Sequence, residues 1–138
     1  MRSSSYGRGV THSIAQAAEH SGLSIDTLRY YERIGLVDPP ARDSGGRRTY
    51  SDADLDWLVF LTRLRTTGMP IKMMREYAQL QHVGPVTRGA RQQILLDHRA
   101  SVRERIAELE SCLGVLDHKI DLYAGLMADE QTARGATA

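Results

Sequence analysis

Arginines cluster in one part of this chain, and arginine is the residue whose planar guanidinium pairs with phosphate or guanine through two parallel hydrogen bonds. Within twenty residues the chain holds three acidic side chains against five arginines, namely Arg29, Arg33, Arg42, Arg47 and Arg48. The whole chain of 138 residues carries a net charge of only +1, so composition alone does not indicate a nucleic-acid partner. The local cluster is where a phosphate-binding surface is expected.

Two short helices are predicted around the first of these arginines. Ser13 and Gln16 form a capping-box pattern for a helix that Gly22 should end. Ser24 then caps a second helix, which should end at Gly35. A helix, a glycine turn and a second helix are typical of the helix-turn-helix, in which the second helix enters the major groove of DNA. A small core should hold the pair together: Ala15, Ala18, Leu23 and Leu28.

The second helix is therefore the candidate recognition helix. Its exposed face is predicted to present Thr27, Arg29, Tyr30 and Arg33 to bases and phosphates. An alternative interpretation is that the pair is only a tight helical corner, with Tyr30 and Tyr31 as ordinary core aromatics.

A short two-stranded hairpin is predicted directly after this helix, between Leu36 and Tyr50. Arg47 and Arg48 follow a glycine turn there. Two arginines alone would usually be a solvated surface, but beside a candidate recognition helix they favour a clamp on phosphates or on the minor groove.

The rest of the chain predicts further helices over 51–68 and 70–80, and then one long helix over 87–123. Apolar residues in this last segment follow an alternating three-four spacing: Leu95, Val102, Ile106, Leu109, Leu113, Leu116, Ile120 and Tyr123. Such a helix would be about 55 Å long, which is too long to fold back on so small a body. A second copy of the chain is the simplest partner for it. The predicted organisation is a flexible leader (1–12), a DNA-binding domain (13–82), a dimerisation helix (87–124) and a flexible tail (125–138).

Taken together, these motifs resemble the MerR family of transcription regulators in order and spacing over about residues 12–124. The resemblance lies in Ser13-Ile14-Ala15, Thr27-Leu28-Arg29-Tyr30-Tyr31-Glu32, Ile34-Gly35-Leu36, Arg47-Arg48-Thr49-Tyr50, Asp54-Leu55, Gly68-Met69 and the end of the long helix. It implies a mainly α fold, namely a winged helix-turn-helix followed by a long helix that forms an antiparallel coiled coil in a homodimer. It also implies that the DNA contacts include Arg29, Tyr30, Arg47, Arg48 and Tyr50.

The resemblance further implies a mechanism. Members of the family bind a pseudo-palindrome in an over-long promoter spacer, and they bend and untwist the DNA so that RNA polymerase holoenzyme engages both promoter elements. Specificity then depends partly on the deformability of bases that the protein never touches. A simple repressor or an architectural DNA-binding protein would use the same residues and remains an alternative.

The sequence indicates the DNA-binding surface more clearly than it indicates a site for an effector. The chain has a single cysteine, Cys112. Its C-terminal half, with Gly68-Met69 and Lys119-Ile120-Asp121, most resembles the branch of the family associated with aldehyde and other electrophile stress. The place where that branch carries a reactive cysteine holds Arg63 here. Cys112 is expected to be a structural thiol, although two copies in a dimer could approach each other. Met69, Met73, Met74 and Tyr77 could line an apolar pocket, although such a stripe is more often core. No metal site within one chain and no cofactor are expected, because the five histidines are scattered.

Other classes of protein are disfavoured. An enzyme lacks its motifs here, since there is no glycine-rich phosphate loop, nucleophile elbow or paired metal ligands. No apolar run is long enough for a membrane helix, and the N-terminus lacks the apolar region of a signal peptide, so a cytoplasmic protein without membrane contact is expected. A coiled-coil module whose helical pair contacts protein instead of DNA is the remaining rival.

Overall fold

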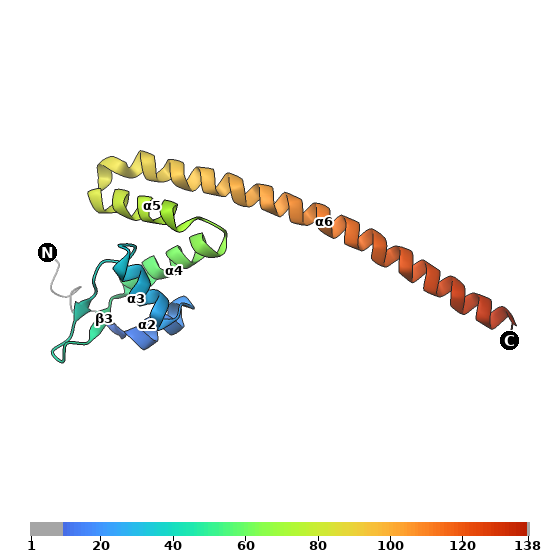
Figure 1. The fold of residues 1–138 in the computed structure, drawn as a ribbon, viewed down its shortest axis with the longest axis horizontal. Coiled ribbons are helices and arrows are strands. Elements are labelled where there is room, and N and C mark those ends of the chain that lie inside the picture. The colour runs from blue at the N-terminus through green and yellow to red at the C-terminus, as the bar shows by residue number, and fades with distance from the viewer. Residues whose placement is uncertain (1–9, 138) are drawn as a thin grey trace. The chain divides into compact units, whose positions relative to one another are not determined.

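The computed structural model describes residues 10–137, with Thr137 described by its backbone only. The chain divides into two compact units, one up to Leu96 and one from Asp97 onward. In chain order (Figure 1), the elements are β1 (His12–Ser13), α2 (Ile14–Ser21), α3 (Ile25–Arg33), β2 (Ala41–Arg42), β3 (Arg48–Tyr50), α4 (Asp52–Thr66), α5 (Ile71–Val83), a 3-10 turn (Pro85–Thr87) and α6 (Arg88–Thr137). The prediction of a mainly α, winged helix-turn-helix chain with a long C-terminal helix is confirmed.

Helices α2 and α3 begin and end at the residues that the sequence indicates. The Ser13 hydroxyl accepts from the Gln16 amide at 3.1 Å, and the Gln16 side chain accepts from the Ser13 amide at 2.8 Å. Gly22 ends α2 with φ of +78°, a left-handed conformation that a glycine adopts without strain. The Ser24 hydroxyl accepts from the Thr27 amide and so caps α3.

The core of the helix pair differs in one residue from the prediction. Ala15 is exposed, whereas Ala17 is fully buried. The reason is the helical period, because a face formed by Ile14, Ala17, Ala18 and Ser21 follows the i, i+3, i+4, i+7 rule and leaves Ala15 on the other side. Among the other predicted core residues, Leu28 is buried and Ala18 and Leu23 are half-buried.

The predicted hairpin is present, and a third strand joins it. Strand β3 lies between β1 and β2, and both of its pairings are antiparallel. His12 pairs with Tyr50 across β1 and β3, and its Nε2 lies 2.8 Å from Asp52 Oδ1. The predicted flexible leader is therefore wrong at residue 12, because β3 supplies a strand partner from a distant part of the chain. Residues 1–9 of that leader lie outside the described residues.

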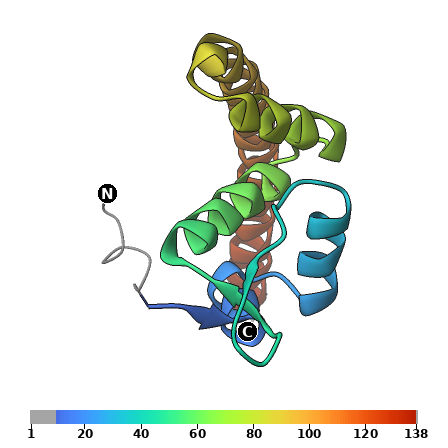
Figure 2. The same cartoon turned by 90° about the vertical axis from the view of Figure 1, so that its left-hand side faces the viewer.

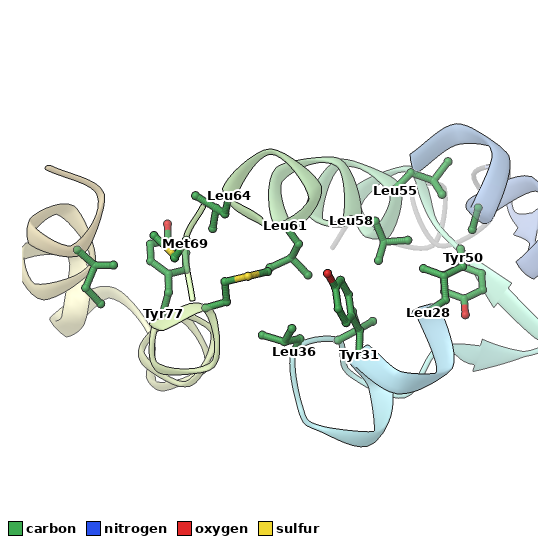
Figure 3. Packing of buried hydrophobic residues seen from close by; sticks show 14 residues of the cluster. Leu28, Tyr31, Leu36, Tyr50, Leu55, Leu58, Leu61, Leu64, Met69 and Tyr77 are labelled. Carbon is green, nitrogen blue, oxygen red and sulfur yellow. The ribbon is translucent and has the colours of Figure 1, made fainter. Parts of the chain in front are cut away.

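Helix α4 carries the centre of the core in the first unit. Figure 2 shows it between α5 and the pair α2 and α3, and Figure 3 shows its leucines along the face that meets Leu36, Tyr31 and Leu28. These leucines are 0% to 5% exposed: Leu55, Leu58, Leu61 and Leu64. This helix thereby holds α3, the helix predicted to recognise DNA, in place.

The end of α5 is closed by Thr87. Its hydroxyl donates to the Leu80 carbonyl at 2.6 Å and lies 2.8 Å from the Gly84 carbonyl oxygen. Arg91 donates from Nε to the Thr87 hydroxyl at 3.0 Å, and its cation lies where the α5 dipole is negative. These bonds hold the turn between α5 and the start of α6.

Helix α6 continues to Thr137, past the end that the sequence predicts near Tyr123. The predicted flexible tail over 125–138 is therefore helical through 137. Its composition explains the difference, because alanine, leucine, methionine, glutamate, glutamine and arginine are strong helix formers and outweigh Gly125 and Gly135. No helix in the described part of the chain is long and apolar enough to cross a membrane.

Candidate nucleic-acid interface

The two faces of helix α3 differ strongly in solvent exposure. Leu28 and Tyr31 are buried at 2% and 4%, whereas Arg29 and Arg33 are exposed and Tyr30 is 40% exposed. The guanidinium carbon of Arg33 lies 5.5 Å from the centre of the Tyr30 ring, a cation–π distance. The face predicted for DNA contact is therefore open to solvent and carries two cations and an aromatic hydroxyl.

The neighbouring tyrosines Tyr30 and Tyr31 have different roles. Burial raises the pKa of the Tyr31 phenol, while the Arg65 charge acts in the opposite direction. The core interpretation is thus correct for Tyr31, and only Tyr30 remains available to a ligand.

Thr27 stands at the start of the same helix. Its Oγ1 lies 2.9 Å from the Ser24 hydroxyl oxygen, and the residue is half-buried. In helix-turn-helix proteins the N-terminal residues of the second helix contact base edges, so this is the position from which a hydroxyl can contact a base or a phosphate.

The wing turn is built around Asp43. Its Oδ1 accepts from the backbone amides of Gly45 at 2.9 Å and Arg47 at 3.0 Å, and Gly46 has φ of +80°. The Arg47 amide is the main reason that the pKa of the Asp43 carboxyl lies below its ordinary value. Arg47 Nε lies 3.4 Å from Asp43 Oδ2, but the Arg47 side chain is 83% exposed, so most of it faces solvent.

Arg48 does not share this exposure. Its Nε lies 3.0 Å from Oε1 of Glu32 on α3, and only 24% of its side chain is exposed. Successive residues of an extended chain point to opposite faces, so Arg47 and Arg48 leave the wing in different directions. Of the two predicted clamp residues, Arg47 is mostly exposed, whereas Arg48 is mostly buried in an ion pair that joins the wing to α3.

Tyr50 is buried, contrary to its prediction as a DNA contact. It lies two residues beyond Arg48 on the same face of β3 and is 2% exposed. Figure 3 shows its ring beside Leu28. Burial is the largest reason that its pKa is raised, and the charges of Arg48, Glu32 and Arg29 also act on it. The geometric link between the wing strand and α3 is the ion pair of Arg48 with Glu32.

None of the predicted effector residues lines the cleft formed by the loop after α3 and helices α4 and α5. Met74 and Tyr77 are buried at 0% and 8%, Met73 is half-buried, and Cys112 is exposed on α6. The cleft, of about 600 Å³, has other lining residues, which had no sequence signal because they meet only through folding: Gly35, Leu36, Val37, Asp38, Asp54, Trp57, Ala78, Gln79, Gln81 and His82. Among the described residues no cluster of three or more potential ligands could hold a metal ion.

Comparison with known proteins identifies the architecture. Residues 12–81 match the family described as MerR HTH family regulatory protein. The chain belongs to the MerR family. Residues 55–119 also match the family described as MerR, DNA binding.

Relatives within the MerR family cover most of the chain. An uncharacterized HTH-type transcriptional regulator of Haemophilus influenzae is 36% identical over 114 residues, which are 83% of this chain and 84% of that protein. The uncharacterized HTH-type transcriptional regulator YyaN of Bacillus subtilis is 33% identical over 131 residues, which are 86% of this chain and 95% of that protein.

A solved structure of the same family is similar in fold. It is HiNmlR, a MerR family regulator lacking the sensor domain, bound to promoter DNA. It has 35% sequence identity and a TM-score of 0.77, and the match covers 86% of this chain and 94% of that one. These relatives are transcription regulators, so the prediction of a DNA-binding regulator instead of an enzyme is confirmed.

Proposed function

We propose that this MerR-family chain acts as a homodimer that binds a pseudo-palindromic promoter site and activates transcription by bending and untwisting the DNA. The observation that carries the DNA-binding part is the exposed face of α3, with Arg29, Tyr30 and Arg33, beside the exposed Arg47 of the wing. If α3 lies in the major groove, its three side chains face the bases and phosphates there. The wing arginine then faces the neighbouring DNA phosphate backbone.

The exposed apolar row of α6 supports the homodimer. Along this helix the predicted seam residues that are at least 49% exposed in the single chain recur at three-four spacing: Ile106, Leu109, Leu113, Leu116, Ile120 and Tyr123. Met127, 60% exposed, continues the same spacing into the helical tail. Val102 at the start of the row is half-buried. The family resemblance favours an antiparallel arrangement of the two helices.

A two-fold dimer would place two recognition helices on one duplex. The pseudo-palindrome then mirrors the protein symmetry, and the site is spread over more than one helical turn of DNA. Distortion of the central base pairs between the half-sites would realign the two promoter elements for RNA polymerase holoenzyme. The regulator and the holoenzyme would then be bound to the same promoter. A bacterial regulator of this kind acts in the cytoplasm, where the promoter DNA is.

In vitro transcription tests this mechanism. The template carries an over-long promoter spacer, and a second template has the spacer shortened to the ordinary length. Activation by the chain on the long spacer only is the expected result, because only that promoter needs untwisting. Repression on both templates would instead favour a simple repressor.

A charge reversal connects this activity to the proposed surface. Arg47→Glu should abolish both DNA binding and activation while the chain remains dimeric by sedimentation, because its side chain has no part in the core. Unchanged DNA affinity in this variant would contradict the proposed interface.

A further inference from the structure

We infer that Glu32 is a positioning residue for DNA binding, and that Arg48 acts by holding the wing to the recognition helix and not by contacting phosphate. This inference rests on the proposed DNA-binding function. It concerns the ion pair between Arg48 Nε and Glu32 Oε1, 3.0 Å apart, with side chains 24% and 21% exposed.

The pair joins elements that must keep a fixed spacing to grip DNA together. Glu32 lies in the last turn of α3, the recognition helix, and Arg48 is the first residue of β3. Arg48 is also the strand partner of Arg42, whose Nη1 donates to the Gly46 carbonyl at 2.7 Å. These contacts connect Arg48 to the turn that carries Arg47, so a shift of Arg48 should also move that turn.

Burial and charge separate Arg48 from Arg47. Arg47 pairs at 3.4 Å with Asp43 of its own turn and stays 83% exposed, whereas Arg48 pairs at 3.0 Å with Glu32 on another element and is only 24% exposed. A phosphate at Arg48 would compete with the Glu32 carboxylate, which neutralises most of the attraction that the guanidinium could offer. A charge-assisted hydrogen bond of this kind is worth more than an exposed pair because little of it faces water.

The two possible roles of Glu32 predict opposite changes in DNA affinity when its charge is removed. If Glu32 only adds negative charge near the DNA, Glu32→Gln should raise affinity, since it removes a repulsion. If Glu32 positions the wing, Glu32→Gln should lower affinity, and we expect a loss of about tenfold, the equivalent of one charge-assisted hydrogen bond. The sign of the change therefore distinguishes the two roles.

The salt dependence of binding gives a second readout. An arginine that contacts phosphate contributes about one unit to the slope of log affinity against log salt concentration. Arg47→Gln should reduce that slope by about one. Arg48→Gln should lower affinity about as much as Glu32→Gln does and leave the slope unchanged.

The experiment uses the full chain and a duplex that the wild-type chain selects from a random pool. Affinity is measured over a range of salt for Glu32→Gln, Arg48→Gln, the double variant, Arg47→Gln and the control Glu19→Gln, which removes an exposed acid from α2. We expect the double variant to lose no more affinity than either single variant, because both substitutions remove the same ion pair. Urea unfolding checks that every variant is folded, and the charge-swapped pair Glu32→Arg with Arg48→Glu should recover affinity.

The inference is overturned if Glu32→Gln binds as tightly as wild type or more tightly, if Arg48→Gln lowers the slope as Arg47→Gln does, or if the charge-swapped pair is no better than its single variants. A wild-type chain that selects no duplex would instead refute the proposed function, and the inference with it. A loss of affinity in Glu19→Gln equal to that of Glu32→Gln would also overturn the specific role of Glu32.

Discussion

Tyr30 and Tyr31 show how much one step along a helix changes the role of a residue. Tyr31 is 4% exposed and belongs to the core, while Tyr30 is 40% exposed and lies beneath Arg33. In the same way Arg47 and Arg48 are neighbours in the chain but belong to an open turn and a half-buried ion pair. At this scale function depends on the direction of each side chain more than on its chemistry.

Matched substitutions of the two tyrosines should affect different properties of the protein, namely stability for Tyr31 and DNA binding for Tyr30. Tyr31→Ala should lower the free energy of unfolding by about 3–5 kcal/mol, because a buried aromatic is removed from the core. Tyr30→Ala should leave stability nearly unchanged and weaken DNA binding. Urea unfolding and fluorescence anisotropy of labelled duplex measure the two quantities, and a Tyr30→Ala protein that binds DNA normally would remove Tyr30 from the interface.

The stability of the wing turn should depend on pH, because the Asp43 carboxylate holds the turn. Its carboxyl pKa is lowered in the folded chain, first by the hydrogen bond from the Arg47 amide, below the ordinary value of 3.8. The stabilising contribution of the carboxylate is therefore complete above that ordinary value and is lost as the pH falls through the lower folded pKa. The Arg47 amide resonance should titrate with a midpoint below 3.8 in the wild type.

The matched control for this titration is Asp43→Asn, which keeps an oxygen acceptor but cannot lose a proton in this range. Its Arg47 amide should show no midpoint. A wild-type midpoint at or above the ordinary carboxyl value would mean that the charged form of Asp43 does not hold the turn.

Helix ends are the clearest feature at the scale of the elements. Ser13 and Ser51 each cap a helix whose third residue bonds back to the cap, so two backbone amides are satisfied at each end. At the other end of α5, a hydroxyl from a later residue, Thr87, serves the same purpose for carbonyls. These local bonds set where each helix begins and ends, and packing then decides how the helices meet.

Ser51→Ala tests the value of one such cap. The free energy of unfolding should fall by about 1 kcal/mol, because the Asp54 amide loses its acceptor at the start of α4. Ser51→Asp should restore most of the loss, since a carboxylate caps as well and suits the helix dipole. Thermal unfolding followed by circular dichroism gives both values, and equal stability of all three proteins would show that the cap contributes little here.

The local signals in the sequence were sufficient for the hairpin and for the helices other than the end of α6, because caps, glycines and apolar periods act within a few residues. Contacts between distant residues had no such signal. The pairing of His12 with Tyr50, the ion pair of Arg48 with Glu32 and the burial of Tyr50 all depend on contacts between segments that lie apart in the sequence. For that reason the exposed part of the candidate site could be predicted, and the groups that hold it in place could not.

At the scale of the whole molecule, the apolar row of α6 predicts that DNA binding depends on assembly of the dimer. Leu116 and Met127 are 56% and 60% exposed in the single chain and would be covered in the proposed dimer. Leu116→Asp should convert the protein to a monomer, and Met127→Asp should weaken the dimer. DNA affinity should fall in parallel, because a monomer holds only one half-site.

Sedimentation equilibrium over a range of protein concentration measures this assembly. Ser111→Asp is the control, since it adds the same charge to the same helix on the side away from the seam. If Leu116→Asp stays dimeric, or if Ser111→Asp separates the chains equally well, the interface is not where the heptad pattern places it.

Trp57 gives the protein an internal fluorophore, because it is the single tryptophan of the chain. Its indole N–H donates to the Leu36 carbonyl at 2.8 Å, and its ring stacks on Tyr77 with 6.1 Å between the ring centres. The emission of this one ring therefore reports on the place where the loop after α3 meets α4 and α5. A red shift on binding any ligand would signal that water has entered this junction, without a dye or a tag.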